Sequence, residues 1–174
     1  ATAVAGTPQD TVMQAATARN AFKAAVVPDQ LPLAAVDADG KMHGFDIDVA
    51  EALAKRLGLP VQFVTPGWSN ILAGESAKPW DFAVASITPT PRREKQISFP
   101  ALYRMDAAVV VVRSGETKFE RPQDVSGKAI AVKAKTTFER YLRRDLNLDE
   151  GGADIAYVIE NAKVVPAASN GDAL

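Results

Sequence analysis

The sequence predicts an α/β fold, in which strands and helices alternate along the chain. Short apolar runs occur at 60–64, 81–86 and 107–113, and their length is typical of strands that are buried on both faces of a sheet. The segment that begins at Asp46 has the spacing of an amphipathic helix instead. A second strand-and-helix set begins at residue 129. Alternation of this kind favours sheets that are covered by helices.

The N-terminal part is predicted to contain a leader helix, a strand and a turn. Asp10 is a suitable N-cap for a weak helix that reaches about Phe22. An apolar run at 23–27 indicates a strand, and prolines follow it. The Asp-Ala-Asp-Gly sequence at 37–40 is typical of a turn. We therefore expect a leader segment over 1–22 and a strand pair around the turn.

The helix that begins at Asp46 is the best-defined element. Its apolar positions lie on one face, and basic residues occupy its last turn before Gly58, a typical C-terminal stop. The apolar positions are Val49, Ala50, Leu53, Ala54 and Leu57. A strand at 60–64, a turn and a brief helix starting near Ser69 are expected to follow.

A second α/β unit is predicted after a charged stretch at 113–121. A strand at 129–133 leads to Thr136, which stands three residues before Glu139 in the spacing of a capping box. The charged stretch indicates a boundary between two domains. The expected segments are a leader over 1–22, a first α/β lobe over 23–112 and a partial second lobe over 113–174.

The C-terminus is predicted to begin another helix. Ser169 stands three residues before Asp172, yet the chain ends at Leu174. A helix of one turn is not stable by itself, because nucleation is unfavourable. We therefore expect the chain to be C-terminally truncated.

Composition excludes several classes of partner and cofactor. The 174 residues include 20 basic and 21 acidic side chains, so the net charge of −1 supplies no basic surface for nucleic acid. The chain has no cysteine and one histidine, which excludes thiol chemistry, disulfides and the usual zinc sites. No apolar stretch approaches the ~20 residues of a membrane span. We expect no metal and no cofactor.

The sequence offers few catalytic residues. His43 is the one histidine and no nucleophile-elbow sequence accompanies it, so it is interpreted as an exposed turn residue. A carboxylate cluster comprising Asp46, Asp48 and Glu51 is explained by the favourable helix dipole in a first turn. No glycine-rich phosphate loop of standard spacing is present. No catalytic residue is therefore assigned.

A polar loop at 86–93 directly follows a predicted strand. Its sequence contains hydroxyl side chains and two arginines, and residues 88–96 are expected to form a loop or one helical turn. Loops at the carboxyl ends of parallel strands bind ligands in open α/β sheets. An arginine and hydroxyls there would suit a carboxylate, while a solvated turn with a surface arginine is the alternative.

Several collinear motifs give the chain a family resemblance. Gly-Phe-Asp-Ile-Asp-Val at 44–49, together with segments 81–93, 99–103 and 127–139, resembles family 3 periplasmic solute-binding proteins, the amino-acid receptors of ABC importers. The resemblance implies a type II periplasmic binding fold, with two α/β lobes joined by a hinge that close around an amino acid. The second lobe and the return segment would be incomplete in this chain.

The resemblance also implies roles for residues of the first lobe. Arg93 matches the arginine that grips the ligand α-carboxylate, Thr88 matches the hydroxyl residue beside it, and Ser86 a position that contacts the ligand backbone. Trp68 matches an aromatic wall over the ligand side chain, although a core anchor is the alternative for this indole. Where the family has an aromatic wall before Pro32, this chain has Gln30.

In the second lobe, Thr136 and Thr137 match a Gly-Thr-Thr turn that meets the carboxylate. Lys133 occupies a position of side-chain contact in some relatives, and Lys135 stands where glycine is usual. The aspartate that binds the ligand amino group in the family would lie beyond Leu174. Gln30 and Lys133 favour a polar ligand, since an aliphatic one would leave their hydrogen bonds unmade.

The predicted function is that of a periplasmic receptor, exported with its signal peptide removed. It would bind an amino acid or related zwitterion as a monomer and deliver it to the membrane permease of an ABC transporter, without performing catalysis. The alternative is an enzyme of the same fold resembling cyclohexadienyl dehydratase, which acts on prephenate or arogenate.

Overall fold

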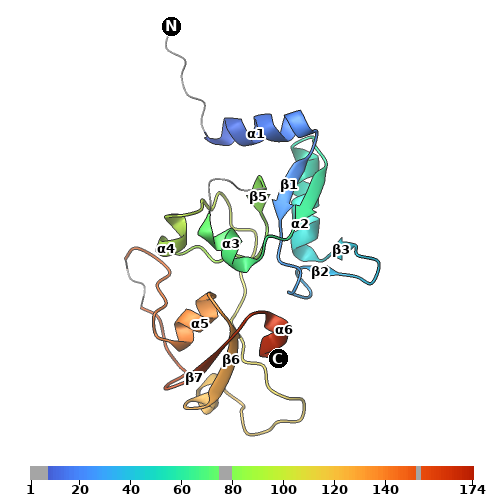
Figure 1. The fold of residues 1–174 in the computed structure, drawn as a ribbon. Helices are drawn as coiled ribbons and strands as arrows, with labels where there is room; N and C mark the ends of the chain where they lie inside the picture. Colours follow the sequence, from blue (N-terminus) through green and yellow to red (C-terminus); the bar gives the residue numbers. More distant parts are fainter. Residues whose placement is uncertain (1–7, 75–79, 152–153) are drawn as a thin grey trace. The chain divides into compact units, whose positions relative to one another are not determined.

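The computed structural model describes residues 8–74, 80–151 and 154–174, and it divides into two compact units, Ala1–Ile87 and Thr88–Leu174 (Figure 1). The division falls within the predicted first lobe, 23–112, and the lobe boundaries stay a prediction. No helix in the described part of the chain is both long enough and apolar enough to span a membrane.

The first unit is built on a parallel sheet of three strands in the order β4-β1-β5. β1 (Phe22–Ala25) lies in the centre and pairs in parallel with β4 (Val61–Val64) and with β5 (Phe82–Ala83). The alternation of strand and helix therefore gives the parallel arrangement that the sequence predicts. Because all three strands run in one direction, their carboxyl ends meet at the same edge of the sheet.

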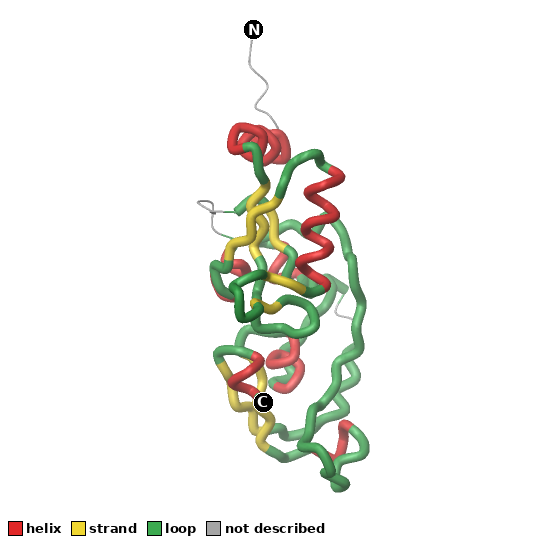
Figure 2. The backbone as a smooth tube through the Cα atoms, turned by 90° about the vertical axis from the view of Figure 1, so that its right-hand side faces the viewer, coloured by secondary structure: helices red, strands yellow, loops and turns green. Residues whose placement is uncertain are grey.

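Helices pack on this sheet through small side chains. α2 (Phe45–Arg56) runs alongside the three strands (Figure 2) and contributes Ile47, Ala50 and Ala54 to the core. Alanines at these positions face Ala24 and Phe22 of the central strand. The predicted helix from Asp46 is confirmed, and its end is marked by Gly58 at φ +81, the left-handed conformation that favours glycine.

The remaining elements of the first unit follow the prediction with small shifts. α1 (Pro8–Arg19) begins before Asp10, so the predicted N-cap position is wrong. β2 (Ala35–Val36) and β3 (Met42–His43) form the expected antiparallel pair around the turn. α3 (Trp68–Ala73) begins one residue before Ser69.

Gly44 allows the close approach of two segments at the start of α2. It is the N-cap residue at φ +125 and ψ 173, a backbone region that only glycine adopts easily. A Cβ atom at this position would collide with the carbonyl oxygen of Leu33 and lie 2.9 Å from that of Pro32. The amide groups of Phe45 and Asp46 donate to these same two carbonyls, which fixes the segment against the helix.

The second unit contains a parallel strand pair with short helices. β6 (Ala129–Lys133) pairs with β7 (Lys163–Ala167), and α5 (Thr137–Leu142) and α6 (Asn170–Ala173) follow the two strands. The predicted start of α6 is confirmed, since Ser169 and Asp172 form a reciprocal capping box. A helical turn, α4 (Pro91–Glu94), and a 3-10 turn, η1 (Pro122–Val125), precede the strands.

The predicted strand at 107–113 is wrong, because this segment forms no strand in the structure. Val109 is 79% exposed and Val111 is 68% exposed. An apolar run becomes a strand only when another strand supplies its hydrogen bonds, and no described segment pairs with it. The predicted strand at 81–86 is also shortened, to the two residues of β5.

Candidate functional site

Three predicted ligand residues of the first unit follow the carboxyl ends of its parallel strands. Gln30 lies after β1, Trp68 after β4 and Ser86 after β5. The shared edge therefore collects the polar and aromatic side chains that the sequence singles out, at the position where open α/β sheets bind ligands.

Trp68 is the first residue of α3 and is half-buried. Its ring packs against the apolar cluster of Ala25, Val27, Ile71 and Ala85. This packing supports the core-anchor alternative for the indole. Trp68 as a residue is only partly buried, and its role as an aromatic wall stays a prediction.

Gln30, which stands where the family has an aromatic residue, lies in a tight turn. Its carbonyl oxygen accepts from the amides of Leu33 at 2.6 Å and Ala34 at 3.0 Å, and its own amide donates to Ala34 O at 3.1 Å. The backbone of this loop is thus held by its own hydrogen bonds, with the Gln30 side chain half-buried.

The structure adds Asp46, which the sequence assigns to the helix dipole only. The hydroxyl of Ser86 donates to the carboxylate of Asp46, at 3.2 Å from Oδ1 and 3.1 Å from Oδ2. Asp46 is buried, whereas Asp48 in the same helical turn is exposed. No pattern in the sequence separates these two aspartates, because the loop that supplies Ser86 is distant along the chain.

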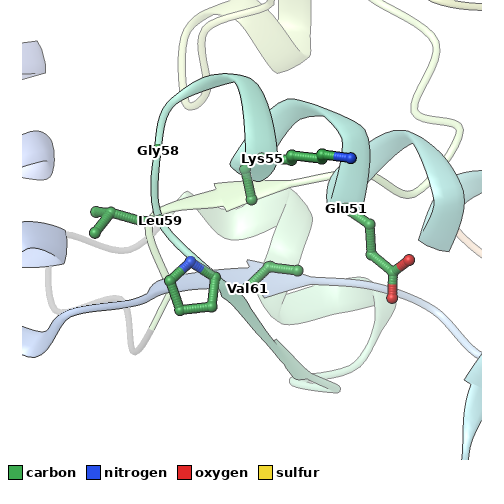
Figure 3. A pocket seen from close by; sticks show the side chains of 7 residues that line it. Glu51, Lys55, Gly58, Leu59 and Val61 are labelled. Atoms are coloured by element: carbon green, nitrogen blue, oxygen red, sulfur yellow. The ribbon is translucent and has the colours of Figure 1, made fainter.

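A hollow of about 500 Å³ lies at the other end of the sheet (Figure 3). Its lining comes from the end of α2 and the start of β4 and includes Glu51, Lys55, Leu59 and Val61. It is wide open, and Ala54, Gly58 and Pro60 also line it. None of the predicted ligand residues lines this hollow, so it is unrelated to the carboxyl edge.

Arg93 is the central residue of the predicted site in the second unit. It is 9% exposed, and Thr90, the N-cap of α4, accepts from its amide at 3.3 Å. Its guanidinium donates to the carbonyl oxygens of Thr88 at 2.8 Å and Lys135 at 3.1 Å. Burial, and then the nearby charge of Arg140, lowers the pKa of Arg93 to about 10. The guanidinium therefore stays protonated at neutral pH.

The hydrogen bond to the Lys135 carbonyl places Arg93 at the turn that contains three other predicted ligand-binding residues. Lys133 is the last residue of β6 and is 4% exposed, Thr136 is the N-cap of α5, and Thr137 is the first residue of α5. The Thr136 hydroxyl donates to Lys133 O at 2.7 Å and accepts from Glu139 N at 3.2 Å. The structure thus gathers Arg93, the Thr88 carbonyl and this turn in one place.

The predicted capping box at Thr136 is altered at one end. The carboxylate of Glu139 accepts from Lys135 N at 2.7 Å rather than from the amide of the N-cap residue. This backbone hydrogen bond is the main cause that lowers the pKa of Glu139, and the Arg143 side chain, bonded at 3.0 Å, adds to it. Glu139 therefore holds this turn through two contacts: its carboxylate binds the Lys135 amide, and its own amide binds the Thr136 hydroxyl.

Replacement of Lys135 by glycine should stabilise the second unit. Lys135 has φ +62, a left-handed conformation that costs a side-chain-bearing residue about 1–2 kcal/mol. Its hydrogen bonds with the Arg93 guanidinium and the Glu139 carboxylate use backbone atoms and would survive in Lys135→Gly. After the greater chain entropy of glycine is subtracted, we expect a gain of about 0.5–1 kcal/mol in the free energy of unfolding.

The control is Lys135→Ala, which removes the same charge and keeps the unfavourable φ. Urea denaturation followed by tyrosine fluorescence reports this unit, because Tyr103, Tyr141 and Tyr157 all lie in it. Equal stability of the glycine and alanine variants would contradict the prediction.

The described residues contain no group of three or more acidic, histidine or cysteine side chains arranged to hold a metal ion. Charge-assisted hydrogen bonding by Arg93 is the chemistry that the gathered residues can supply, and it suits a carboxylate.

The family model for bacterial extracellular solute-binding proteins, family 3, matches residues 22–167. The chain belongs to this family. It is similar to a probable amino-acid ABC transporter-binding protein of Haemophilus influenzae, with 32% identity over 102 residues, which cover 59% of this chain and 40% of the relative. The L-cystine-binding protein TcyJ of Escherichia coli K12 is 29% identical over 109 residues, covering 62% of this chain and 41% of that protein.

Among solved structures, the chain is similar to the ancestral amino acid-binding protein AncCDT-1, described as a precursor of cyclohexadienyl dehydratase. The TM-score is 0.75 at 27% identity, covering 92% of this chain and 66% of that one. The predicted family and the type II periplasmic binding fold are therefore confirmed. The chain spans about two fifths of the length of the two curated relatives.

Proposed function

We propose that this protein is an extracytoplasmic receptor that binds an amino acid or a related zwitterion for import. The observation that carries the proposal is the burial of the Arg93 guanidinium against the Lys135 carbonyl, at the turn that begins α5. A buried guanidinium that stays charged at neutral pH can give a ligand carboxylate charge-assisted hydrogen bonds, which are stronger than bonds between neutral groups. In this proposal the hydroxyl groups of Thr88 and Thr136 would bind the same ligand carboxylate.

The other predicted residues would recognise the rest of the ligand. Ser86 would contact the ligand backbone, with Thr137 assisting at the carboxylate, while Gln30, Trp68 and Lys133 would meet the ligand side chain. Trp68 offers apolar area and a cation–π face, and Gln30 and Lys133 offer hydrogen bonds. These hydrogen-bonding residues favour a polar ligand side chain over an aliphatic one.

The proposed partner is the membrane permease of an ABC transporter. The family of extracellular solute-binding proteins and the transporter-binding relatives support this role. We further propose that the receptor acts as a monomer after removal of a signal peptide. It would deliver its ligand without chemical change.

A thermal-shift screen against the common amino acids tests the proposal. A ligand that binds only the folded state raises the melting temperature, by mass action. We expect a rise with at least one amino acid, and we would include L-cystine and the cationic amino acids at several concentrations. Prephenate is added in a parallel assay for phenylpyruvate. Turnover of prephenate without any amino-acid shift would favour the dehydratase alternative and contradict the receptor.

A further inference from the structure

Asp46 has an environment that helix capping does not explain. It is 1% exposed, which makes it one of the four buried polar or charged residues of the described chain. A carboxylate in a first helical turn is stabilised by the helix dipole even when it is exposed. Asp48, in the same turn, is an example. Burial of a carboxylate adds a desolvation cost that must be offset by hydrogen bonds. The helix dipole alone therefore does not explain why Asp46 is buried.

The atoms of Asp46 connect two loops of the carboxyl edge. Its amide donates to Leu33 O at 2.8 Å, in the tight turn that holds Gln30. Its carboxylate accepts from the Ser86 hydroxyl at 3.1 and 3.2 Å. One residue on a rigid helix thus touches the loop after β1 and the loop after β5.

The backbone of Ser86 shows what the carboxylate holds in place. Ser86 has φ +49, in the left-handed region where residues other than glycine are uncommon. Glycine adopts this conformation at no steric cost. A serine there requires an interaction that offsets the unfavourable backbone, and its hydroxyl bond to Asp46 is such an interaction. Strained backbone conformations of this kind concentrate at functional sites.

We propose that Asp46 is a positioning residue of the ligand site. It does not touch the ligand, but it holds Ser86 in the left-handed conformation and aligns that residue with the Gln30 loop. The inference rests on the proposed function, since the ligand contacts of Ser86 and Gln30 are part of that proposal. Its structural part, the control of the Ser86 backbone by Asp46, stands independently and is tested independently.

The test uses four variants of the full chain and one control variant. Asp46→Asn keeps one acceptor for the Ser86 hydroxyl, and Asp46→Leu keeps the volume without any acceptor. Ser86→Gly permits the left-handed backbone without a hydroxyl, and it is also combined with Asp46→Leu. Asp48→Asn is the matched control, because it removes an exposed carboxylate from the same helical turn.

Affinity is measured by calorimetry with L-arginine and L-cystine, and with the amino acid that gives the largest thermal shift. We expect Asp46→Leu to weaken binding by about tenfold or more, a factor typical of a lost hydrogen bond to a charged group, and Asp46→Asn to weaken it by less. Asp48→Asn should bind like the parent. The double variant should recover to within about threefold of Ser86→Gly, because glycine needs no carboxylate to hold its backbone.

A second measurement separates this inference from the proposed function. Amide hydrogen exchange at residues 86–88 should become faster in Asp46→Leu and return toward the parent rate in the double variant. A carboxylate that only supports the core would lower the melting temperature without rescue by glycine. If the parent protein binds no amino acid, the proposed receptor function is wrong. The exchange data still decide whether Asp46 controls the Ser86 backbone. Absence of rescue in the exchange data would overturn the inference.

Discussion

Replacement of Arg93 by alanine should weaken amino-acid binding by about 2–5 kcal/mol, a loss well above tenfold. The guanidinium is buried and points to the Thr88 and Lys135 carbonyls, so a ligand carboxylate bound there would be largely desolvated. Charge-assisted hydrogen bonds are strongest in such surroundings. Calorimetric titration of the parent and the variant with the best ligand of the screen measures the effect.

Arg92 provides a matched control for this experiment. It has the same side chain and lies on the same helical turn, but it is exposed. Arg92→Ala should therefore bind like the parent. The melting temperatures of both variants are recorded as well, because Arg93→Ala also loses two hydrogen bonds within the second unit. Equal affinities of Arg93→Ala and the parent would refute the assignment of the carboxylate site.

The affinity of the parent should also be insensitive to pH near neutrality. The pKa of Arg93 is lowered to about 10 by burial and by Arg140, which leaves the guanidinium charged at pH 6–8. The ligand carboxylate is ionised throughout this range. The Arg93 pair therefore contributes equally across it, and the contribution of this pair should begin to fall only as the pH approaches 10.

Replacement of Gly44 by alanine should destabilise the first unit by about 2–5 kcal/mol. The new Cβ would overlap the Leu33 carbonyl oxygen and lie 2.7 Å from its carbonyl carbon. Neither backbone atom can move without breaking the bonds that Phe45 and Asp46 make to this segment. The φ of +125 adds strain of its own, because side-chain-bearing residues avoid it.

Gly40→Ala separates the two causes of this loss. Gly40 also has a positive φ, of +80, but a Cβ there meets no atom within 4 Å. We expect this control to lose only about 1–2 kcal/mol from the backbone conformation. Urea denaturation followed by tryptophan fluorescence reports the first unit, since Trp68 and Trp80 both lie in it. Equal losses in the two variants would show that the contact with Leu33 is unimportant.

Local sequence patterns predicted much of the fold, but they failed where the formation of a strand depends on pairing with another strand. The helix α2 and the capping box at Ser169 were predictable because their signals lie within neighbouring turns. Residues 107–113 have a stronger apolar pattern than β5, yet β5 is the strand, because Phe82 and Ala83 have Ala24 and Ala25 as partners. An apolar pattern indicates which segment can be buried, but it does not indicate whether another segment is available to pair with it.

The sequence by itself determined the family, the parallel α/β arrangement and the loops that follow the strands. These properties depend on spacing and turn residues over short stretches of chain. The tertiary structure decided which polar residues are buried, since Ser86 reaches Asp46 across 40 positions and Arg93 reaches Lys135 across 42. Burial and hydrogen-bond partners over such separations depend on the packing of whole elements. The roles of Asp46 and of the left-handed Ser86 therefore emerged only from the folded chain.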